Sequence, residues 1–199
     1  MTIFSQVLSV IMTIGQDKSH TPTPTPTPTP ATSVPSSQSN QTVEPAHNSL
    51  VPPNDSFDAD PRERADGVFV YGTLKSGFGN HQVIKPHVVS IESATVQGLI
   101  YDLGPFPAMT LHTNESQTPQ TVQGEFVTVN ELGSALRDLD RLEGYAPGRP
   151  HNLYDCQVTT VTLPNGDTKQ ACVYVMPMAS SRGKLVEPMN GVASWSGRQ

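Results

Sequence analysis

The segment VFVYGTL at residues 68–74 joins an apolar run to a turn that contains a glycine. The apolar run predicts a strand, and glycine lets the backbone after that strand approach a neighbouring group closely. Successive backbone N–H groups in such a turn can hold an anion or a developing oxyanion, and a threonine hydroxyl lies beside them. An ordinary turn closing an edge strand has the same composition, so both interpretations are open for the four candidate binding residues, Tyr71, Gly72, Thr73 and Leu74.

A helix is predicted from Glu131 to Glu143, with Asn130 as its N-cap and Gly144 as its C-terminal stop. Its apolar face carries leucines with i, i+4, i+7 spacing, at positions 132, 136 and 139, and Glu143 is the next position on that face. Burial and the negative end of the helix dipole are both expected to raise the pKa of this carboxyl group toward the neutral range. Glu143 is therefore a candidate general acid/base.

The opposite interpretation is that the helix ends one residue earlier. The carboxylate of Glu143 would then be exposed or paired with Arg141 or Arg149, because one residue is enough to rotate a helical side chain into water. Asp138 and Asp140 lie off the apolar face, and we expect both in solvent.

Further strands are predicted at residues 95–103, 122–129, 154–163 and 168–176. Gly98 marks a bend or bulge in the first of these, and residues 104–108 break it. Because the strands are mostly far apart in sequence and only one helix is clear, the fold class is α+β. An antiparallel or mixed sheet curled into a small barrel is the expected architecture.

The two cysteines, Cys156 and Cys172, fall on strands that flank a turn at Asn165-Gly166. If that turn is a two-residue hairpin loop, Cys156 faces Val175 and Cys172 faces Thr159. The thiols are then not cross-strand partners, so no structural disulfide is predicted. This agrees with a reducing compartment.

Composition divides the chain into three parts. Residues 1–66 contain ten prolines and a Thr-Pro repeat at 21–30, and we expect a disordered tail whose repeat is an extended polyproline II spacer. Residues 67–180 form the predicted globular domain. Residues 181–199 are expected to be irregular, with a short helix near Lys184 and with Trp195 on the surface.

Charge excludes one class of partner. Three basic and seven acidic residues precede residue 67, and nine basic and eleven acidic residues follow, so the predicted domain is nearly neutral. No cluster of Lys and Arg interleaves with aromatic residues, and we therefore expect no nucleic-acid partner. The histidines lack the spacing of metal ligands, so no metal is predicted. No serine stands in a Gly-X-Ser-X-Gly nucleophile elbow, so covalent catalysis is not predicted either, and no cofactor is expected.

Residues 1–12 are apolar but too short to span a bilayer, and no Lys or Arg precedes them. A short docking helix, a start codon chosen too far upstream and a weak export signal all remain open as explanations. No other long apolar run is present, so we expect a soluble, cytoplasmic protein without a membrane partner.

Four motifs occur in an order that resembles the gamma-glutamylcyclotransferase-like superfamily. These motifs, spread over about residues 67–178, are VFVYGTLK at 68–75, Asn80-His81, GLIYDLG at 98–104 with Pro107-Ala108, and LDRLEGY at 139–145. The resemblance implies a small β-barrel with a cavity, whose floor holds the Tyr71–Leu74 turn and whose wall holds Glu143.

Members of the superfamily cyclise the glutamyl group of a γ-glutamyl amine or amide to 5-oxoproline. The resemblance implies that Glu143 is the general acid/base, that residues 71–74 bind the glutamyl group, and that no cofactor is needed. In many relatives a basic residue follows the Leu-Tyr pair after the catalytic helix, whereas this chain has Asp155 there. The substrate contact of that basic side chain and the substrate class are therefore left open. The sequence also does not identify the amine released or the oligomeric state.

Two other kinds of function remain as alternatives. A protein with this fold could bind a small ligand or regulate a partner without catalysis, and the Thr-Pro tail could make the chain an interaction scaffold. Turnover of γ-glutamyl amines distinguishes the enzyme from both.

Overall fold

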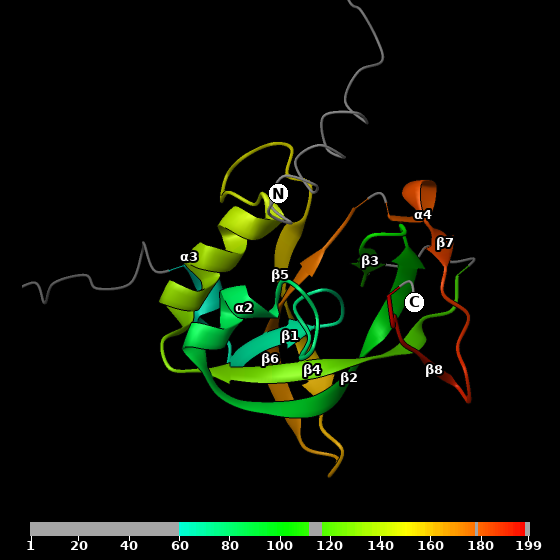
Figure 1. Ribbon diagram of the computed structural model, residues 1–199, viewed down its shortest axis with the longest axis horizontal. Helices are drawn as coiled ribbons and strands as arrows, with labels where there is room; N and C mark the ends of the chain where they lie inside the picture. Colours follow the sequence, from blue (N-terminus) through cyan, green and yellow to red (C-terminus); the bar gives the residue numbers. More distant parts are fainter. Residues whose placement is uncertain (1–59, 112–116, 178, 198–199) are drawn as a thin grey trace, which may run out of the picture. The chain divides into compact units, whose positions relative to one another are not determined.

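The computed structural model describes residues 60–111, 117–177 and 179–197. Five strands form a closed barrel: β1 (Gly67–Val70), β2 (Val88–Asp102), β4 (Gln120–Val129), β5 (Asp155–Thr162) and β6 (Thr168–Val175). They follow one another around the barrel as β2, β5, β6, β1 and β4, and β4 pairs again with β2 (Figure 1). β1 and β6 are parallel, and the other four pairings are antiparallel. The predicted α+β fold with a mixed barrel is confirmed.

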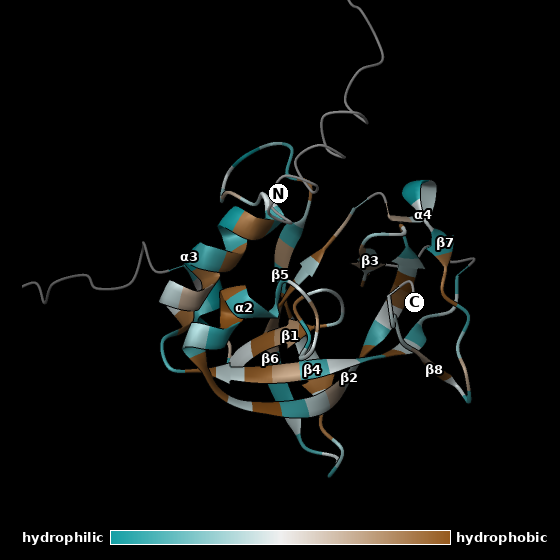
Figure 2. Ribbon diagram, in the orientation of Figure 1, coloured by the Kyte–Doolittle hydropathy of each residue, from teal (hydrophilic) through white to brown (hydrophobic). Residues whose placement is uncertain are grey.

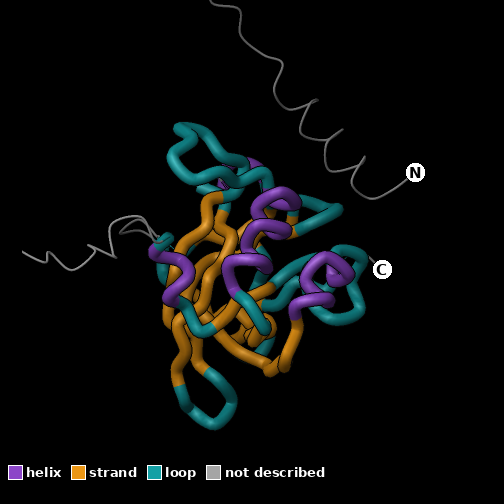
Figure 3. Tube along the Cα trace, turned by 90° about the vertical axis from the view of Figure 1, so that its left-hand side faces the viewer, coloured by secondary structure: helices purple, strands orange, loops and turns teal. Residues whose placement is uncertain are grey.

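The barrel strands have two different faces because side chains alternate along each strand. In β1, Phe69 and Tyr71, the residue that follows the strand, belong to the apolar cluster inside the barrel, while Val68 and Val70 belong to a second cluster outside it. Helix α3 (Leu132–Glu143) contributes Leu136 and Leu139 to this outer cluster. Figure 3 shows the helices on the outside of the strands, and Figure 2 shows apolar and polar residues alternating along α3. Burial of the predicted leucine face thus fixes α3 to β1 and β6.

Strand β2 is long enough to join two sheets. Its residues up to Gly98 pair with β4, and those from Leu99 to Asp102 pair with β3 (Pro107–Thr110). A Cβ at Gly98 would lie 2.8 Å from the carbonyl oxygen of Thr110, so glycine is needed where the strand changes partner. The register irregularity of β2 lies between Val88 and Ser90 and not at Gly98, where the sequence predicts a bend or bulge. The predicted break at residues 104–108 is shorter than expected, because β3 begins at Pro107.

The hairpin of β5 and β6 has a register one residue away from the prediction. Leu163 pairs with Asp167 through a backbone hydrogen bond of 2.8 Å, so the loop has three residues, and Gly166 has a φ of 89°. Cys156 therefore faces Tyr174, and Cys172 faces Val158. Both cysteines are free thiols.

The structure at the two ends of the domain also differs from the prediction. The tail prediction for residues 1–59 lies outside the described residues, but Pro61–Arg64 form a 3-10 helix, and the N–H of Asp66 donates to the carbonyl of Gln170. At the other end β7 (Lys184–Leu185) pairs with β2, and β8 (Val192–Ala193) pairs with β4. The surface position predicted for Trp195 is wrong, because its side chain is buried with the barrel interior.

The remaining elements are short. They are α2 (His81–Ile84), a 3-10 helix (Lys85–His87) and α4 (Ala179–Arg182). Among the described residues, the model contains no helix with the length and hydrophobicity that a membrane crossing requires.

Candidate active site

The last turn of α3 is intact up to Glu143. Gly144 adopts a left-handed conformation, with a φ of 69°, and the backbone N–H groups of Gly144 and Tyr145 both donate to the carbonyl oxygen of Asp140. At the other end, Glu131 rather than Asn130 is the N-cap residue, and the Asn130 side chain accepts the N–H of Glu131. The helix therefore does not fray before Glu143.

The carboxyl group of Glu143 is half-buried and has no partner among the described residues. No residue in the described ranges donates a hydrogen bond to it or forms an ion pair with it, and Arg141 instead pairs with Asp138 at 2.9 Å. Burial raises its pKa from 4.5 to about 7. This carboxyl group can accept and return a proton near neutral pH, which is the chemistry of a general acid/base.

In the loop after β1, the carbonyl groups of residues 72–74 are paired, whereas their amide groups have no acceptor among the described residues. The carbonyl oxygen of Gly72 accepts the N–H of Lys75, that of Thr73 accepts the N–H of Asn80, and that of Leu74 accepts Nδ1 of His81 at 3.0 Å. Within the described part of the chain, no acceptor pairs with the backbone N–H of Gly72, Thr73 or Leu74. Three successive unpaired donors are rare in folded proteins, so this loop can take an external acceptor such as a carboxylate or oxyanion.

Pro107, the first residue of β3, connects the loop to Tyr154. A Cβ at Gly72 would lie 2.6 Å from Cγ of the proline, so the backbone and the ring are in close contact. The carbonyl oxygen of Pro107 accepts the hydroxyl of Tyr154 at 2.9 Å. The lack of a side chain at Gly72 therefore allows the loop to pack against a residue that Tyr154 holds.

Substitution of Gly72 by alanine should destabilise the protein by about 1–3 kcal/mol, because the new methyl group overlaps the ring of Pro107. Gly133→Ala is the matched control, since its Cβ would meet the carboxylate end of the exposed Glu63 side chain. Urea unfolding of both variants measures the difference. Equal stability of the two variants would contradict the close contact at Gly72.

A chain of hydrogen bonds links the helix end to the loop. The hydroxyl of Tyr174 donates to Oδ1 of Asp140 at 2.6 Å, and the carbonyl oxygen of Tyr174 accepts the hydroxyl of Tyr71 at 2.7 Å. Tyr174 lies on β6, Asp140 on the last turns of α3, and Tyr71 immediately before Gly72. The two candidate parts of the site are thus connected through one buried tyrosine.

The pKa values of two tyrosines depend on the charges of Glu143 and Arg182. Burial raises the pKa of Tyr71, and the negative charge of Glu143 adds to that effect. Burial also raises the pKa of Tyr154, as do Tyr71 and Glu143, whereas the positive charge of Arg182 opposes the increase. The negative charge of Glu143 therefore acts on both Tyr71 and Tyr154, and the positive charge of Arg182 acts on Tyr154.

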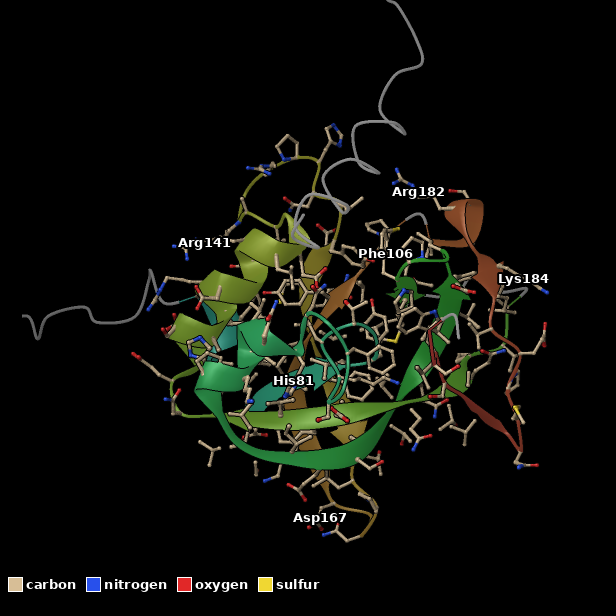
Figure 4. All side chains as sticks on the ribbon, viewed as in Figure 1. His81, Phe106, Arg141, Asp167, Arg182 and Lys184 are labelled. Atoms are coloured by element: carbon tan, nitrogen blue, oxygen red, sulfur yellow. The ribbon has the colours of Figure 1, made fainter. Side chains whose placement is uncertain are left out.

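Sequence reasoning missed several of these residues. Pro107 and Tyr154 lie in or beside the family-like motifs, but sequence reasoning gave neither a role in the site, and Arg182 belongs to no motif. Pro107 contacts Gly72, Tyr154 donates to Pro107, and the charge of Arg182 acts on Tyr154. The prediction that Asp140 is solvated is wrong: its side chain is 15% exposed and receives hydrogen bonds from Arg62 and Tyr174. Figure 4 shows Arg141 pointing away from the barrel, as expected for the outer face of α3, and Arg182 at α4.

The described residues also form a shallow depression of about 370 Å³ that neither Glu143 nor residues 71–74 line. Lys75 and Glu125 line it together with residues of β2, β4 and Ser194. The cavity expected between the Tyr71–Leu74 loop and Glu143 stays a prediction. Within the described ranges, no group of His, Cys, Asp and Glu side chains has the arrangement of a metal site.

Comparison with known proteins identifies the family. The model of the family described as "Gamma-glutamyl cyclotransferase, AIG2-like" matches residues 68–195. A gamma-L-glutamyl-butirosin B gamma-glutamyl cyclotransferase from Niallia circulans is 34% identical over 113 residues, which cover 54% of this chain and 65% of that relative.

Solved structures show weaker likeness. The protein YkqA from Bacillus subtilis is 24% identical, with a TM-score of 0.44, over 60% of this chain and 39% of that one. An AIG2-like protein from Mus musculus is 22% identical, with a TM-score of 0.39, over 68% of this chain and 98% of that one. On the match of the family model to more than half of its length, the chain belongs to the gamma-glutamyl cyclotransferase, AIG2-like family.

Proposed function

We propose that the protein is a γ-glutamyl cyclotransferase, which converts a γ-glutamyl amine or amide to 5-oxoproline and releases the amine. The observation that carries this proposal combines two features of the described residues. Glu143 has a carboxyl group with a raised pKa and no partner among them, and its charge acts on Tyr71, which precedes three backbone N–H groups that no described residue accepts. Family membership and the name of the relative from Niallia circulans support it.

The substrate supplies its own nucleophile in this reaction. Its α-amino nitrogen attacks the γ-carbonyl carbon, a new C–N bond closes a five-membered ring, and the C–N bond to the leaving amine breaks. Because nucleophile and electrophile are in one molecule, the protein has to hold a folded conformer rather than bring two reactants together. No change of oxidation state occurs.

Glu143 is proposed to move the proton. Its carboxylate accepts a proton from the attacking amine and returns it to the leaving nitrogen, which would otherwise depart as a poor leaving group. A pKa of about 7 suits both directions of transfer, since a carboxylate with an ordinary pKa is a weak base and rarely protonated at neutral pH.

The amide groups of Gly72, Thr73 and Leu74 are proposed to bind the glutamyl end of the substrate. They can hold its α-carboxylate or the oxyanion that forms at the γ-carbonyl. Position 155 has no basic side chain, and its carboxylate accepts a hydrogen bond from Asn152. Arg182 is the positive charge that acts on Tyr154, and we assign to it the attraction of an anionic substrate.

A panel of γ-glutamyl compounds tests the activity. It should contain γ-glutamyl amines, γ-glutamyl dipeptides and γ-L-glutamyl-butirosin B, with 5-oxoproline and the free amine measured together. Equimolar 5-oxoproline and amine are expected for at least one member. Release of glutamate instead would show hydrolysis and contradict the proposal, and binding without any product would indicate a non-catalytic binding module.

The pH dependence of kcat/KM should have an acid limb with a midpoint near 7. Glu143 must be ionised to accept a proton, and burial keeps it protonated until the pH reaches its raised pKa. The rate should therefore rise through this range and not near 4.5. The amine pKa of each substrate, titrated separately, is the control, and a limb that follows only the substrate amine would contradict the assignment.

We propose the cytoplasm as the compartment of this reaction. Cys156 and Cys172 are free thiols, and free thiols are typical of reducing compartments.

A further inference from the structure

Arg62 lies outside the segment that matches the family model, which begins at residue 68. Its side chain is nevertheless buried, with 7% of the residue exposed. Among the described residues, no other charged residue is buried to this extent. It belongs to the 3-10 helix Pro61–Arg64 that precedes β1. Burying a guanidinium group without partners would strongly destabilise the folded state, so the contacts of Arg62 show how the fold accommodates its charge.

The guanidinium group forms two forked pairs. Its Nε and Nη2 donate to the carboxylate of Asp60, at 2.9 and 2.6 Å, and its Nη1 and Nη2 donate to the carboxylate of Asp140, at 2.8 and 3.1 Å. Burial disfavours the charge, but the hydrogen bonds to Asp140 and Asp60 outweigh it and raise the pKa of Arg62. The planar fork is specific to arginine and fixes direction as well as distance.

Arg62 contacts residues that precede and follow Glu143 in the sequence. Asp140 is three residues before it, and the guanidinium carbon stands 4.7 Å from the ring centroid of Tyr145, two residues after it. Asp140 and Tyr145 are themselves joined by a backbone hydrogen bond of 2.9 Å. Arg62 therefore holds the segment that carries Glu143 at two points.

We propose that Arg62 is a positioning residue, which fixes the C-terminal turn of α3 so that the carboxyl group of Glu143 faces the Tyr71–Leu74 loop. The segment before the family domain is then part of the catalytic unit. This inference rests on the proposed function for its kinetic consequence, but its structural consequence can be measured without any activity.

The expected kinetic effect is on kcat. Arg62→Met keeps most of the side-chain volume and removes the forks, and kcat should fall by about tenfold or more, because small displacements of a catalytic group reduce rate strongly. KM should change by less than about threefold, since the binding loop is not altered. Arg141→Met is the matched control: Arg141 lies two residues from Glu143, pairs with Asp138 on the outer face, and should leave both constants nearly unchanged.

The expected structural effect is on the titration of Glu143. Its raised pKa is caused by burial, and the charged or titratable groups around it are Tyr71 and Tyr154, with Arg182 acting on Tyr154. If Arg62→Met loosens the helix end and admits water, the midpoint should move from about 7 toward 4.5. NMR titration of the glutamate carboxyl carbons measures it, and the control variant should keep the original midpoint.

A double variant covers the case in which Arg62→Met does not fold. Arg62→Met/Asp140→Asn removes both charges of the Arg62–Asp140 pair, which proteins tolerate better than the loss of one partner. Low kcat with a lowered Glu143 midpoint in this folded variant supports positioning. Wild-type kcat and midpoint in either folded variant overturn it.

Failure of the proposed function has a different signature. Wild-type protein that forms no 5-oxoproline rejects the cyclotransferase activity, while the Glu143 midpoints of the variants still decide whether Arg62 positions the carboxyl group.

Discussion

Glu143→Gln is expected to lower kcat by about 10²–10⁴-fold, the usual contribution of a general acid/base. The amide has the shape of the carboxyl group but cannot accept a proton at neutral pH. KM should change much less, because the backbone groups of the Tyr71–Leu74 loop remain in place. Steady-state rates with a γ-glutamyl amine measure the effect, and a fully active variant would reject the assigned mechanism.

The same substitution should stabilise the folded protein above pH 7. The folded-state pKa of about 7 lies above the ordinary value of 4.5, so the folded state binds the proton more tightly than the unfolded state. The resulting stability is fully present below pH 4.5 and is lost as the pH rises to 7, with a total on the order of 3 kcal/mol. Glutamine has no such loss.

Glu131→Gln is the control for both effects. Glu131 is exposed at the opposite end of α3, and its substitution should change neither kcat nor the pH dependence of stability. A loss of activity at both positions would point to a general effect of charge rather than to proton transfer at Glu143.

Asp140→Ala is expected to destabilise the protein by about 3–5 kcal/mol, the typical result of removing one partner from a buried ion pair. The Asp140 carboxylate accepts Nη1 and Nη2 of Arg62 and the hydroxyl of Tyr174, at 2.6 to 3.1 Å. Alanine leaves the tyrosine hydroxyl without this acceptor and leaves the guanidinium with Asp60. Urea unfolding measures the loss of stability.

Asp138→Ala provides the comparison on the same helix. Asp138 also has two partners, His87 and Arg141, but it lies near the solvent, where water replaces lost ion pairs. Its substitution should therefore cost far less than that of Asp140. Equal losses at the two positions would contradict the burial of the Arg62–Asp140 pair.

Local patterns predict one part of the site well. The leucine spacing of α3, the stop at Gly144 and the apolar strand before Tyr71 are encoded within a few residues, and the structure has them within one residue of the predicted bounds. The order of motifs along the chain indicates the barrel, which no single strand pattern does.

The contacts that connect the site depend on distant residues. Asp140 is polar and off the leucine face, so helix periodicity predicts solvent, but the 3-10 helix carrying Arg62 covers it. Arg62 itself lies at the end of a proline-rich stretch whose composition is typical of disorder. Trp195 follows a Ser- and Gly-rich segment, yet it donates to Asp102, and its ring packs at a tilt against Phe78. Such contacts follow from the folded barrel rather than from local sequence.

The burial of the Glu143 carboxyl group can be measured directly by NMR titration of the wild-type protein. The carboxyl carbon signal is assigned by its absence in Glu143→Gln, and its chemical shift is followed from acid to neutral pH. We predict a midpoint near 7, well separated from those of the exposed glutamates. A midpoint near 4.5 would show a solvated carboxylate and contradict the role assigned to Glu143.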